Sequence, residues 1–328
     1  MKIRLAAIAK DEAAYLPRWI YHHLRFGFDE IDIYVNNTTD NSVAVLDKIS
    51  SQFPVRVIAA DFIYERRRSI SFQREAYSII LQDAIKQDVT HLLFLDIDEF
   101  WTPRDLVTSI HQCLEDTGYP DVISFAWANK VDEDVTFAGP YSQHTRSIEN
   151  VHVKSLFRTS LKIRKLEVHN VISDNATYLL GDGRENLRKG KSTIDPQELG
   201  IEGPKRFFIL HRMWRSQIEY ISRLGQGKNL DRNGKAVSTF DLKRNRKGFM
   251  VPFLDAPEST FEIQEEVLDE YETGYREFLS TCDLEASMEE AQEFIIDRAK
   301  MVWRELPAAR ANNPRLVEKL LSNVAIAK

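Results

Sequence analysis

Two aspartates separated by one residue, Asp96 and Asp98, follow a run of hydrophobic residues and are the side chains best suited to chemistry. Side chains two positions apart in an extended segment point the same way, so both carboxylates can converge on one divalent cation. Such a cation neutralises a diphosphate and helps it leave. The alternative is a solvated acidic turn. The hydrophobic run before the pair, and Phe100 and Trp101 after it, favour a built site in which the aromatic residues form a wall for a sugar or nucleotide.

Phosphatases of the haloacid dehalogenase type also place Asp-x-Asp after a hydrophobic strand. Their signature continues with Thr or Val two residues after the second Asp, and it usually lies near the N-terminus. Here Phe100 occupies that position, and three strand patterns precede the motif. The sequence therefore disfavours a phosphatase of this type.

Strand and helix patterns alternate over the first hundred residues. Hydrophobic runs and alternation predict strands over 3–9, 31–35, 54–59 and 91–95. Helical periodicity predicts helices over 13–26, 43–50 and 72–86. This order predicts an α/β fold with a mostly parallel, doubly wound, Rossmann-like sheet. Ligands of such sheets bind at the carboxyl ends of the strands, so the loops after Ala9, Val35, Ala59 and Leu95 are expected to face the ligand.

The pattern changes from residue 121 onwards. We expect strands over 122–127, 153–158 and 206–210, and a helix over 216–224. After Pro257 the chain is predicted to be helical and acidic, with breaks at Gly274, near Thr281 and at Pro307. No internal repeat or low-complexity tract interrupts this organisation.

Composition sets broad limits. With 328 residues, 43% hydrophobic and 29% charged, the chain is globular and long enough for one large α/β domain with a helical extension, or for two modest domains. Residues 154–247 carry 21 Lys and Arg against 10 Asp and Glu, whereas residues 248–328 carry 8 against 17. A basic middle suits a diphosphate or a phospholipid head group, although two solvated faces of different sign would give the same count.

The sequence also bears on partners and location. No helix concentrates basic residues on one face, so we expect no nucleic acid partner. Two cysteines cannot form a disulfide framework, no apolar run reaches membrane-spanning length, and the stretch 3–9 is too short for a signal peptide. We therefore expect a cytoplasmic protein, with peripheral contact at the inner face of a membrane and homo-oligomerisation both left open.

Several segments, in order over about residues 1 to 230, resemble the family 2 glycosyltransferases and more closely the related family 92. They are Lys10-Asp11-Glu12 with 15–22, Phe26-Gly27-Phe28-Asp29, 33–40, 91–100, 153–158 with Val168-His169, and 210–216. Three positions depart from the pattern. Asp11 replaces the usual Asn, Asn37 stands where many family 2 members have Asp, and Arg212 replaces the usual Tyr.

The resemblance implies a GT-A fold with two regions. Residues 1–250 would form the transferase domain, with 1–120 as the nucleotide-sugar half and 121–250 as the acceptor half. Residues 251–328 would form an acidic helical C-terminal extension. It also implies a UDP-sugar donor, Mn²⁺ or Mg²⁺, and inverting transfer of a hexose to a glycan or glycolipid, as in the synthesis of surface polysaccharide, lipopolysaccharide or glycoprotein glycans.

Three residues are expected at the metal. The resemblance implies that Asp98 ligates it directly, and that Asp96 contacts the ribose or a metal-bound water. His211 ends a predicted strand and is a candidate third ligand, because neutral imidazole suits Mn²⁺. The alternative for His211 is a hydrogen-bonded structural residue. Glu99 is expected to orient the neighbouring segment.

The remaining nucleotide contacts are expected around the ends of the first two strands and the start of one helix. The candidates are Ala9, Lys10, Asn36, Asn37, Asp40, Gln73 and Arg74. Loops rich in Asn and Asp are also simply good turns, and Arg74 could equally be an exposed helix start.

An inverting transfer needs a base to take the proton of the acceptor hydroxyl. Asp132 is the first candidate and His169 the second. Trp127 could stack under a sugar ring, with a core position as its alternative. Lys154 and Arg158 could hold a diphosphate together, or could be a surface ion pair.

The sequence disfavours two rival functions. A sugar-nucleotide pyrophosphorylase needs a glycine-rich loop after the first strand, and residues 9–13 contain no glycine. A sugar-binding or scaffolding relative that has lost activity is disfavoured by the intact Asp96-x-Asp98.

Overall fold

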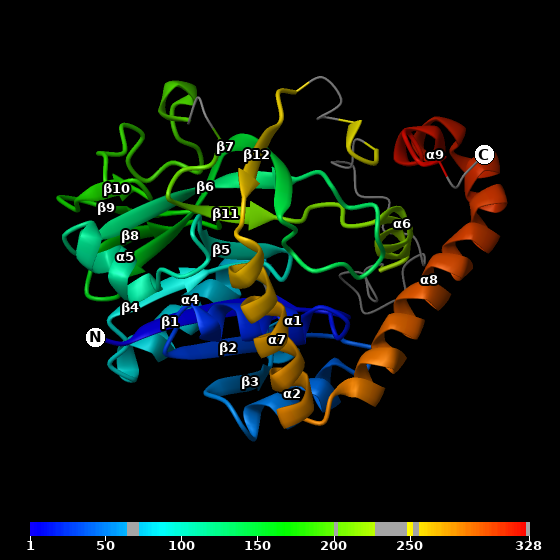
Figure 1. The fold of residues 1–328 in the computed structure, drawn as a ribbon, viewed down its shortest axis with the longest axis horizontal. Helices are drawn as coiled ribbons and strands as arrows, with labels where there is room; N and C mark the ends of the chain where they lie inside the picture. Colours follow the sequence, from blue (N-terminus) through cyan, green and yellow to red (C-terminus); the bar gives the residue numbers. More distant parts are fainter. Residues whose placement is uncertain (64–71, 200–202, 227–247, 252–255, 326–328) are drawn as a thin grey trace.

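A mixed sheet of ten strands organises the described part of the chain, in the order β3-β2-β1-β4-β7-β6-β11-β5, with β10 and β12 pairing to β6 and β7 (Figure 1). The computed structural model describes residues 1–63, 72–199, 203–226, 248–251 and 256–325. The four parallel strands are β1 (Ile3–Ala9), β2 (Glu30–Val35), β3 (Val55–Ala59) and β4 (His91–Phe94). This half closely follows the predicted strands.

The second half of the sheet is mixed. Strand β7 runs antiparallel to β4 and β6, and β5 runs antiparallel to β11. These strands are β5 (Glu99–Pro103), β6 (Val122–Lys130), β7 (His144–Arg158) and β11 (Phe207–His211), with β10 (Tyr178–Leu180) and β12 (Ser259–Glu262) added to them. A two-stranded sheet of β8 (Ile163–Leu166) and β9 (Val171–Ser173) lies apart from it. Strand β5, which the sequence analysis did not predict, carries the chain out of the Asp-x-Asp turn.

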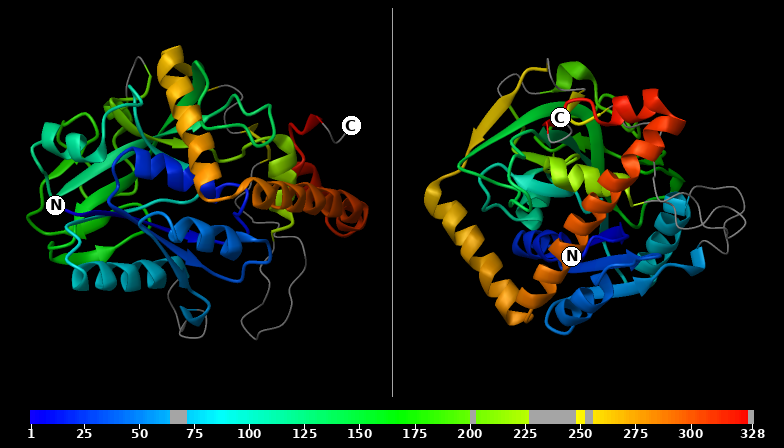
Figure 2. Two further views of the ribbon diagram at one scale, coloured as in Figure 1. Left: turned by 60° about the horizontal axis from the view of Figure 1, so that its bottom comes forward. Right: turned by 90° about the vertical axis from the view of Figure 1, so that its right-hand side faces the viewer.

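Helices cover both faces of the parallel strands because successive side chains alternate. Leu5 and Ala7 belong to the core under α1 (Leu16–Arg25), α2 (Ser42–Ser50), α5 (Ile110–Asp116) and α7 (Glu265–Thr281). Ala6 belongs to the core under α4 (Phe72–Lys86). Figure 2 shows α4 on the opposite side of these strands from α1. The predicted α/β, mostly parallel, doubly wound fold with C-terminal helices is thus confirmed.

Helices also lie beyond the carboxyl ends of β1, β2 and β4 (Figures 1 and 2). They are α6 (Gln217–Leu224), α8 (Glu285–Asn312) and α9 (Pro314–Leu320). Their apolar faces form a separate core that contains Tyr220, Ile221, Val302 and Val317. The C-terminal helices are therefore in contact with the edge of the sheet at which ligands of doubly wound folds bind.

Three expectations for the C-terminal region were wrong. Ser259–Glu262 is not helical but forms β12, which pairs with β7. Helix α8 continues through Pro307. Pro307 is exposed, so a carbonyl that loses its helical partner there can be solvated. Helix α7 continues through Gly274, and the only predicted break that the structure shows within these described helices is the one near Thr281.

Gly274 has a packing role instead of a helix-breaking one. A Cβ atom at this position would lie 2.5 Å from the Tyr21 hydroxyl oxygen on α1. That hydroxyl donates a hydrogen bond to the carbonyl of Tyr271 at 2.7 Å. Glycine therefore lets α7 approach α1 closely enough for this bond to form.

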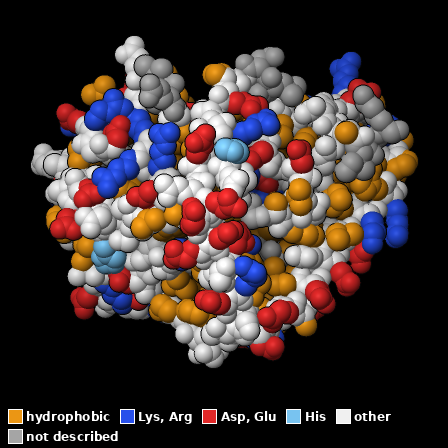
Figure 3. Space-filling model, viewed as in Figure 1, with side chains coloured by type: hydrophobic (Ala, Val, Ile, Leu, Met, Phe, Trp, Pro, Cys, Tyr) orange, Lys and Arg blue, Asp and Glu red, His pale blue; other side chains and the backbone are white. Residues whose placement is uncertain are grey.

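Acidic side chains gather over α7 and along α8 on the face shown in Figure 3. The acidic charge of residues 248–328 is thus carried largely by these two helices. No helix within the described ranges is both long and apolar enough to cross a bilayer.

We predict that Gly274→Ala destabilises the protein by about 1–3 kcal/mol, although alanine favours a helix by about 1 kcal/mol over glycine. The added methyl group overlaps the Tyr21 hydroxyl. Chemical denaturation measures the free energy of unfolding. In the control, Tyr21→Phe removes the overlapping oxygen and leaves ring carbons 3.3 and 3.4 Å from the new Cβ. The double variant should therefore lose less stability than the sum of the single variants. A stabilised Gly274→Ala would contradict this packing.

Candidate active site

The backbone of the turn between β4 and β5 is held by side chains of α1. The Trp19 indole donates to the carbonyls of Asp96 at 3.1 Å and Glu99 at 2.8 Å. All three groups lie at the buried side of the turn, where an unpaired carbonyl is costly. Helix α1 therefore fixes the position from which Asp96 and Asp98 project.

Two buried histidines of α1 extend this support to β5. His22 Nε2 lies 2.8 Å from the carbonyl of Trp101 and donates to it. His23 Nε2 accepts from the amide of Trp101 at 3.2 Å, and its Nδ1 donates to the carbonyl of Trp19 at 2.8 Å. Burial lowers the pKa of His22 to about 3 and the pKa of His23 well below its usual value. Both rings are therefore neutral, and their role is structural.

The two aromatic residues after the motif are both buried, and the wall that they were expected to form for a sugar or nucleotide stays a prediction. Trp101 is fully buried and Phe100 is 3% exposed. Trp101 packs in the core against Phe125 and Phe207. Strand β5 lies beyond β11 at the end of the strand order, where Trp101 serves the core and Phe100 borders a cavity near α1.

Asp96 and Glu99 share a buried lysine. Lys154 Nζ, on β7, lies 3.2 Å from Asp96 Oδ2 and 3.1 Å from Glu99 Oε2. Glu99 Oε2 also accepts from the Asp96 amide at 2.8 Å, as expected for a residue that orients the segment. Burial alone would lower the pKa of Lys154, but the two carboxylates hold this pKa well above its usual value. Lys154 is therefore charged.

Arg158 does not join Lys154. Its guanidinium donates to the carbonyl of Tyr119 at 2.5 Å and lies 3.7 Å from Asp121. In the register between β4 and β7, Arg158 lies opposite His91 at the start of β4, whereas Asp96 follows the end of β4. The predicted joint diphosphate site of Lys154 and Arg158 is therefore wrong.

Asp98 and His211 meet at the carboxyl ends of β4 and β11. Asp98 is 6% exposed, and its Oδ1 lies 3.8 Å from His211 Nε2. Its Oδ2 accepts from Arg223 Nη1 of α6 at 2.8 Å. Burial would raise the pKa of Asp98, but Arg223 and His211 hold it well below its usual range. Asp98 is therefore an ionised carboxylate in a largely closed site.

Gln73 and Arg74 lie on the other side of the Asp-x-Asp turn. Gln73 Nε2 lies 3.4 Å from Asp96 Oδ1 and donates to the Tyr77 hydroxyl at 3.0 Å. Arg74 is about half exposed, and its Nε lies 3.6 Å from Glu167. The structure thus brings Gln73 next to Asp96, with Arg74 adjacent at the start of α4.

The loops after β1 and β2 meet as expected, because the strands are parallel neighbours. The amide of Asn36 donates to the carbonyl of Ala9 at 3.1 Å, and the amide of Asn37 donates to Asp61 at 2.7 Å. Asp40 is different. Its carboxylate accepts from the amides of Ala13 at 2.9 Å and Ser42 at 3.0 Å, which fixes the loop.

The C-terminal helices close this edge. Gln226 donates to the carbonyl of Lys10 at 2.6 Å, just after α6. Arg298 of α8 lies 3.3 Å from Asp11 and donates to Ser222 at 2.9 Å. Arg223 and Arg298 were not predicted from the sequence, because each resembles an ordinary charged residue on the polar face of an amphipathic helix.

The two candidate bases have different surroundings. Asp132 Oδ1 accepts from Lys130 at 2.5 Å, and its Oδ2 accepts from Ser142 at 3.3 Å. His169 donates from Nδ1 to the carbonyl of Val153 at 3.0 Å, which leaves Nε2 as the basic nitrogen. Burial first, and then the charge of Lys154, lower the pKa of His169 to about 4.

Trp127 stands between three imidazoles. Its ring centroid is 4.3 Å from that of His211, 5.3 Å from that of His169 and 5.1 Å from that of His152, on which it stacks. The β6–β7 register shifts between Ala126 and Trp127. This cluster joins the candidate base His169 to the candidate ligand His211.

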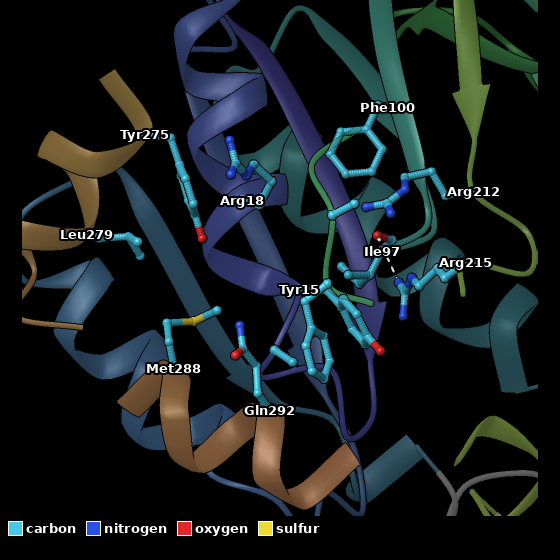
Figure 4. Close-up of a pocket in the computed structure, with 13 residues that line it drawn as sticks. Tyr15, Arg18, Ile97, Phe100, Arg212, Arg215, Tyr275, Leu279, Met288 and Gln292 are labelled. Carbon is cyan, nitrogen blue, oxygen red and sulfur yellow. Dashed lines mark hydrogen bonds between the residues drawn. The ribbon is translucent and has the colours of Figure 1, made fainter. Parts of the chain in front are cut away.

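A cavity of about 190 Å³ lies on the other side of the turn, between α1, α7 and α8 (Figure 4). Ile97 lines it, and Arg215 donates to the Ile97 carbonyl at 3.4 Å while pairing with Glu12 at 3.2 Å. Figure 4 shows Tyr275, Leu279, Met288 and Gln292 facing this space from the C-terminal helices. Side chains of α7 and α8 therefore form one wall of a cavity that Ile97 borders from the turn.

The model of glycosyltransferase family 92 matches residues 7–201, which include the loops after β1 and β2, the Asp-x-Asp turn and His169. The chain belongs to glycosyltransferase family 92. It is therefore a glycosyltransferase, and the family resemblance read from the sequence is confirmed. No curated protein matches it.

Solved structures with a similar arrangement include S. aureus TarS 1–349, with TM-score 0.36, 11% identity and coverage of 94% of this chain and 92% of that one. Another is glucosyl-3-phosphoglycerate synthase of Mycobacterium tuberculosis in complex with Mn²⁺, UDP and phosphoglyceric acid. It gives TM-score 0.26 and 15% identity, with coverage of 38% of this chain and 43% of that one. HddC of Yersinia pseudotuberculosis gives TM-score 0.33 and 10% identity, with coverage of 55% of this chain and 89% of that one. At these TM-scores the likenesses carry no functional conclusion for the family 92 chain.

We predict that Lys154→Met destabilises this family 92 enzyme by about 1–3 kcal/mol. Burial raises the pKa of Glu99 to about 7 even beside Lys154, so without that cation Glu99 is buried as a neutral acid that has lost its partner. Thermal or chemical unfolding measures the loss. Adding Glu99→Gln replaces the acid with a neutral amide that needs no cation, so the double variant should recover part of the lost stability. Equal stability of the single and double variants would show that the pair is not coupled.

Proposed function

We propose that this family 92 enzyme transfers a hexose, with inversion, from a UDP-sugar to a glycan or glycolipid in a reaction that depends on Mn²⁺ or Mg²⁺. One observation carries the proposal. An ionised, nearly buried carboxylate (Asp98) and an imidazole (His211) face each other across 3.8 Å at the carboxyl edge of the sheet. The nucleotide-binding loops end at the same edge.

The donor set fits a divalent cation. His211 Nδ1 is buried and has no hydrogen-bond partner among the described residues, and Nε2 faces Asp98. The described residues hold no group of three His, Cys, Asp or Glu side chains that could bind a metal. Asp98 and His211 would hold the ion with diphosphate oxygens and water, and Asp96 would bind the ribose or a metal-bound water. The ion would supply charge neutralisation to the leaving diphosphate.

Loop positions around this pair are proposed to bind the nucleotide. Ala9 ends β1 and Lys10 follows it, and Asn36 and Asn37 follow the end of β2, so all four lie at the same edge. Gln73 and Arg74 would complete the pocket beside Asp96. Asp40 would act through the loop that it fixes, because its carboxylate is bonded to backbone amides.

His169 is proposed as the general base in preference to Asp132. Its Nε2 is free to accept a proton because Nδ1 is bonded to a carbonyl, whereas the Asp132 carboxylate is paired with Lys130. The acceptor oxygen would bond to the anomeric carbon as the bond from that carbon to the diphosphate breaks, and His169 would take the hydroxyl proton. Trp127, whose buried indole nitrogen has no partner within the described residues, would support a sugar ring.

The alternative hypothesis is a catalytically inactive, sugar-binding role. We also propose a cytoplasmic location and peripheral contact with a membrane. Hydrolysis or transfer of the donor sugar by the purified protein would exclude an inactive role.

We predict that UDP binds the purified protein in the presence of Mn²⁺, and that Asp98→Asn lowers this affinity at least tenfold by removing the anionic ligand. Isothermal titration with and without Mn²⁺ measures it. Asp47→Asn, which neutralises an exposed carboxylate on α2, is the matched control and should bind like the wild type. Metal-independent binding, or none, would exclude this donor site.

We predict that His169→Gln lowers kcat about 10²- to 10⁴-fold while leaving Mn²⁺-dependent UDP binding intact. Asp132→Asn should change kcat much less. Because the pKa of His169 is about 4, the base is already neutral at pH 6, so wild-type activity should fall only as the pH approaches 4. Single-turnover rates with a donor sugar measure the effect. The opposite ranking of the two variants would assign the base to Asp132.

A further inference from the structure

Arg223 bonds to the carboxylate that is proposed to bind the metal. Its Nη1 donates to Asp98 Oδ2 at 2.8 Å and to the carbonyl of Met213 at 3.0 Å. The Arg223 side chain is 32% exposed, whereas Asp98 is 6% exposed. The guanidinium is therefore partly open to solvent, whereas the carboxylate that it pairs with is nearly buried.

The surrounding charges make Arg223 the close counter-ion of Asp98. His211 lies at 3.8 Å from Oδ1, on the other oxygen. Arg215 pairs with Glu12 at 3.2 Å and donates to the Ile97 carbonyl, so these two partners hold its guanidinium on the other side of the turn. Removing Arg223 would leave Asp98 as a nearly buried carboxylate faced directly by one imidazole.

The position of Arg223 is fixed by the C-terminal helices. Helix α6 begins with a capping box between Ser216 and Glu219. The Tyr220 hydroxyl donates to the carbonyl of Leu320 in α9 at 2.8 Å. After α6, a Cβ atom on Gly225 would lie 2.6 Å from Val302 of α8, so the two helices are in close contact. These contacts place the last turn of α6, and with it Arg223, over the carboxyl edge of the sheet.

We infer that Arg223 is a mobile counter-ion: it occupies Asp98 while the site is empty and moves to the nucleotide diphosphate when the divalent cation takes over the carboxylate. This inference rests on the proposed function. A guanidinium on Oδ2 and a divalent cation on Oδ1 would share the charge of one carboxylate and repel each other, whereas a guanidinium and a diphosphate attract each other. Bound metal and bound nucleotide thus become coupled through one side chain, and the C-terminal helices acquire a role in placing it.

Arg223→Ala should therefore change two affinities in opposite directions. In the absence of nucleotide, Mn²⁺ should bind about tenfold more tightly, because its competitor at Asp98 is gone. In the presence of Mn²⁺, UDP should bind about 10- to 100-fold more weakly, because a charge-assisted bond to the diphosphate is lost. A residue that merely shaped the site would weaken both.

The experiment titrates Mn²⁺ into the nucleotide-free protein, following free Mn²⁺ by electron paramagnetic resonance, and titrates UDP into the Mn²⁺-loaded protein by calorimetry. Arg223→Lys keeps the charge and should bind Mn²⁺ as weakly as the wild type. Arg276→Ala removes an exposed arginine from α7 and should change neither affinity. Circular dichroism checks that each variant is folded.

The outcomes separate the two proposals. If the wild type shows no Mn²⁺-dependent UDP binding, the proposed function fails. If the wild type shows it but Arg223→Ala leaves Mn²⁺ affinity unchanged or lowers it, the counter-ion role is overturned. Tighter Mn²⁺ binding in Arg223→Ala, with Arg223→Lys unchanged, supports it.

Discussion

The site depends on a set of hydrogen bonds from α1 to the backbone that follows β4. Trp19, His22 and His23 pair with the carbonyls and the amide of residues 96–101, all in the interior. Because these side chains, together with the Glu99 carboxylate, satisfy the backbone, neither Asp96 nor Asp98 is needed for that purpose. Asp96 and Asp98 remain available for ligands, and their direction is set by a helix that is itself part of the core.

Around this turn, each buried acid has a cation from a different part of the chain. Lys154 comes from β7, Arg223 from α6, and the Arg215 that pairs with Glu12 from the segment after β11. Buried ion pairs contribute little net stability compared with apolar packing, but breaking one is costly. This arrangement keeps a highly charged site folded before any ligand arrives. It also ties the second half of the sheet and the C-terminal helices to one short turn.

The first half of the fold could be predicted closely because its strands are hydrophobic runs or alternate between apolar and polar residues, and its helices are periodic. Strand β1 was predicted over the residues it occupies, and the Asp-x-Asp turn was predicted at its observed place. Strand β5 was missed because the acidic motif hides the start of a short strand. The breaks at Gly274 and Pro307 were wrong because tertiary packing decided the first and solvent exposure allowed the second. Neither appears in a sequence pattern. Arg223 and Arg298 could not be predicted, since their partners lie 125 and 287 residues away.

The contact between Arg298 and Asp11 joins positions near the two ends of the chain. During synthesis the parallel strands emerge first and can form their core early, but the edge that carries the motif waits for α6 and α8. A ribosome-bound chain that already contains every strand of the parallel half still lacks Arg298. Contacts between such distant residues slow folding, because a long loop must close before they form. The contacts that α6 and α8 make with this edge can thus form only after most of the chain has been synthesised.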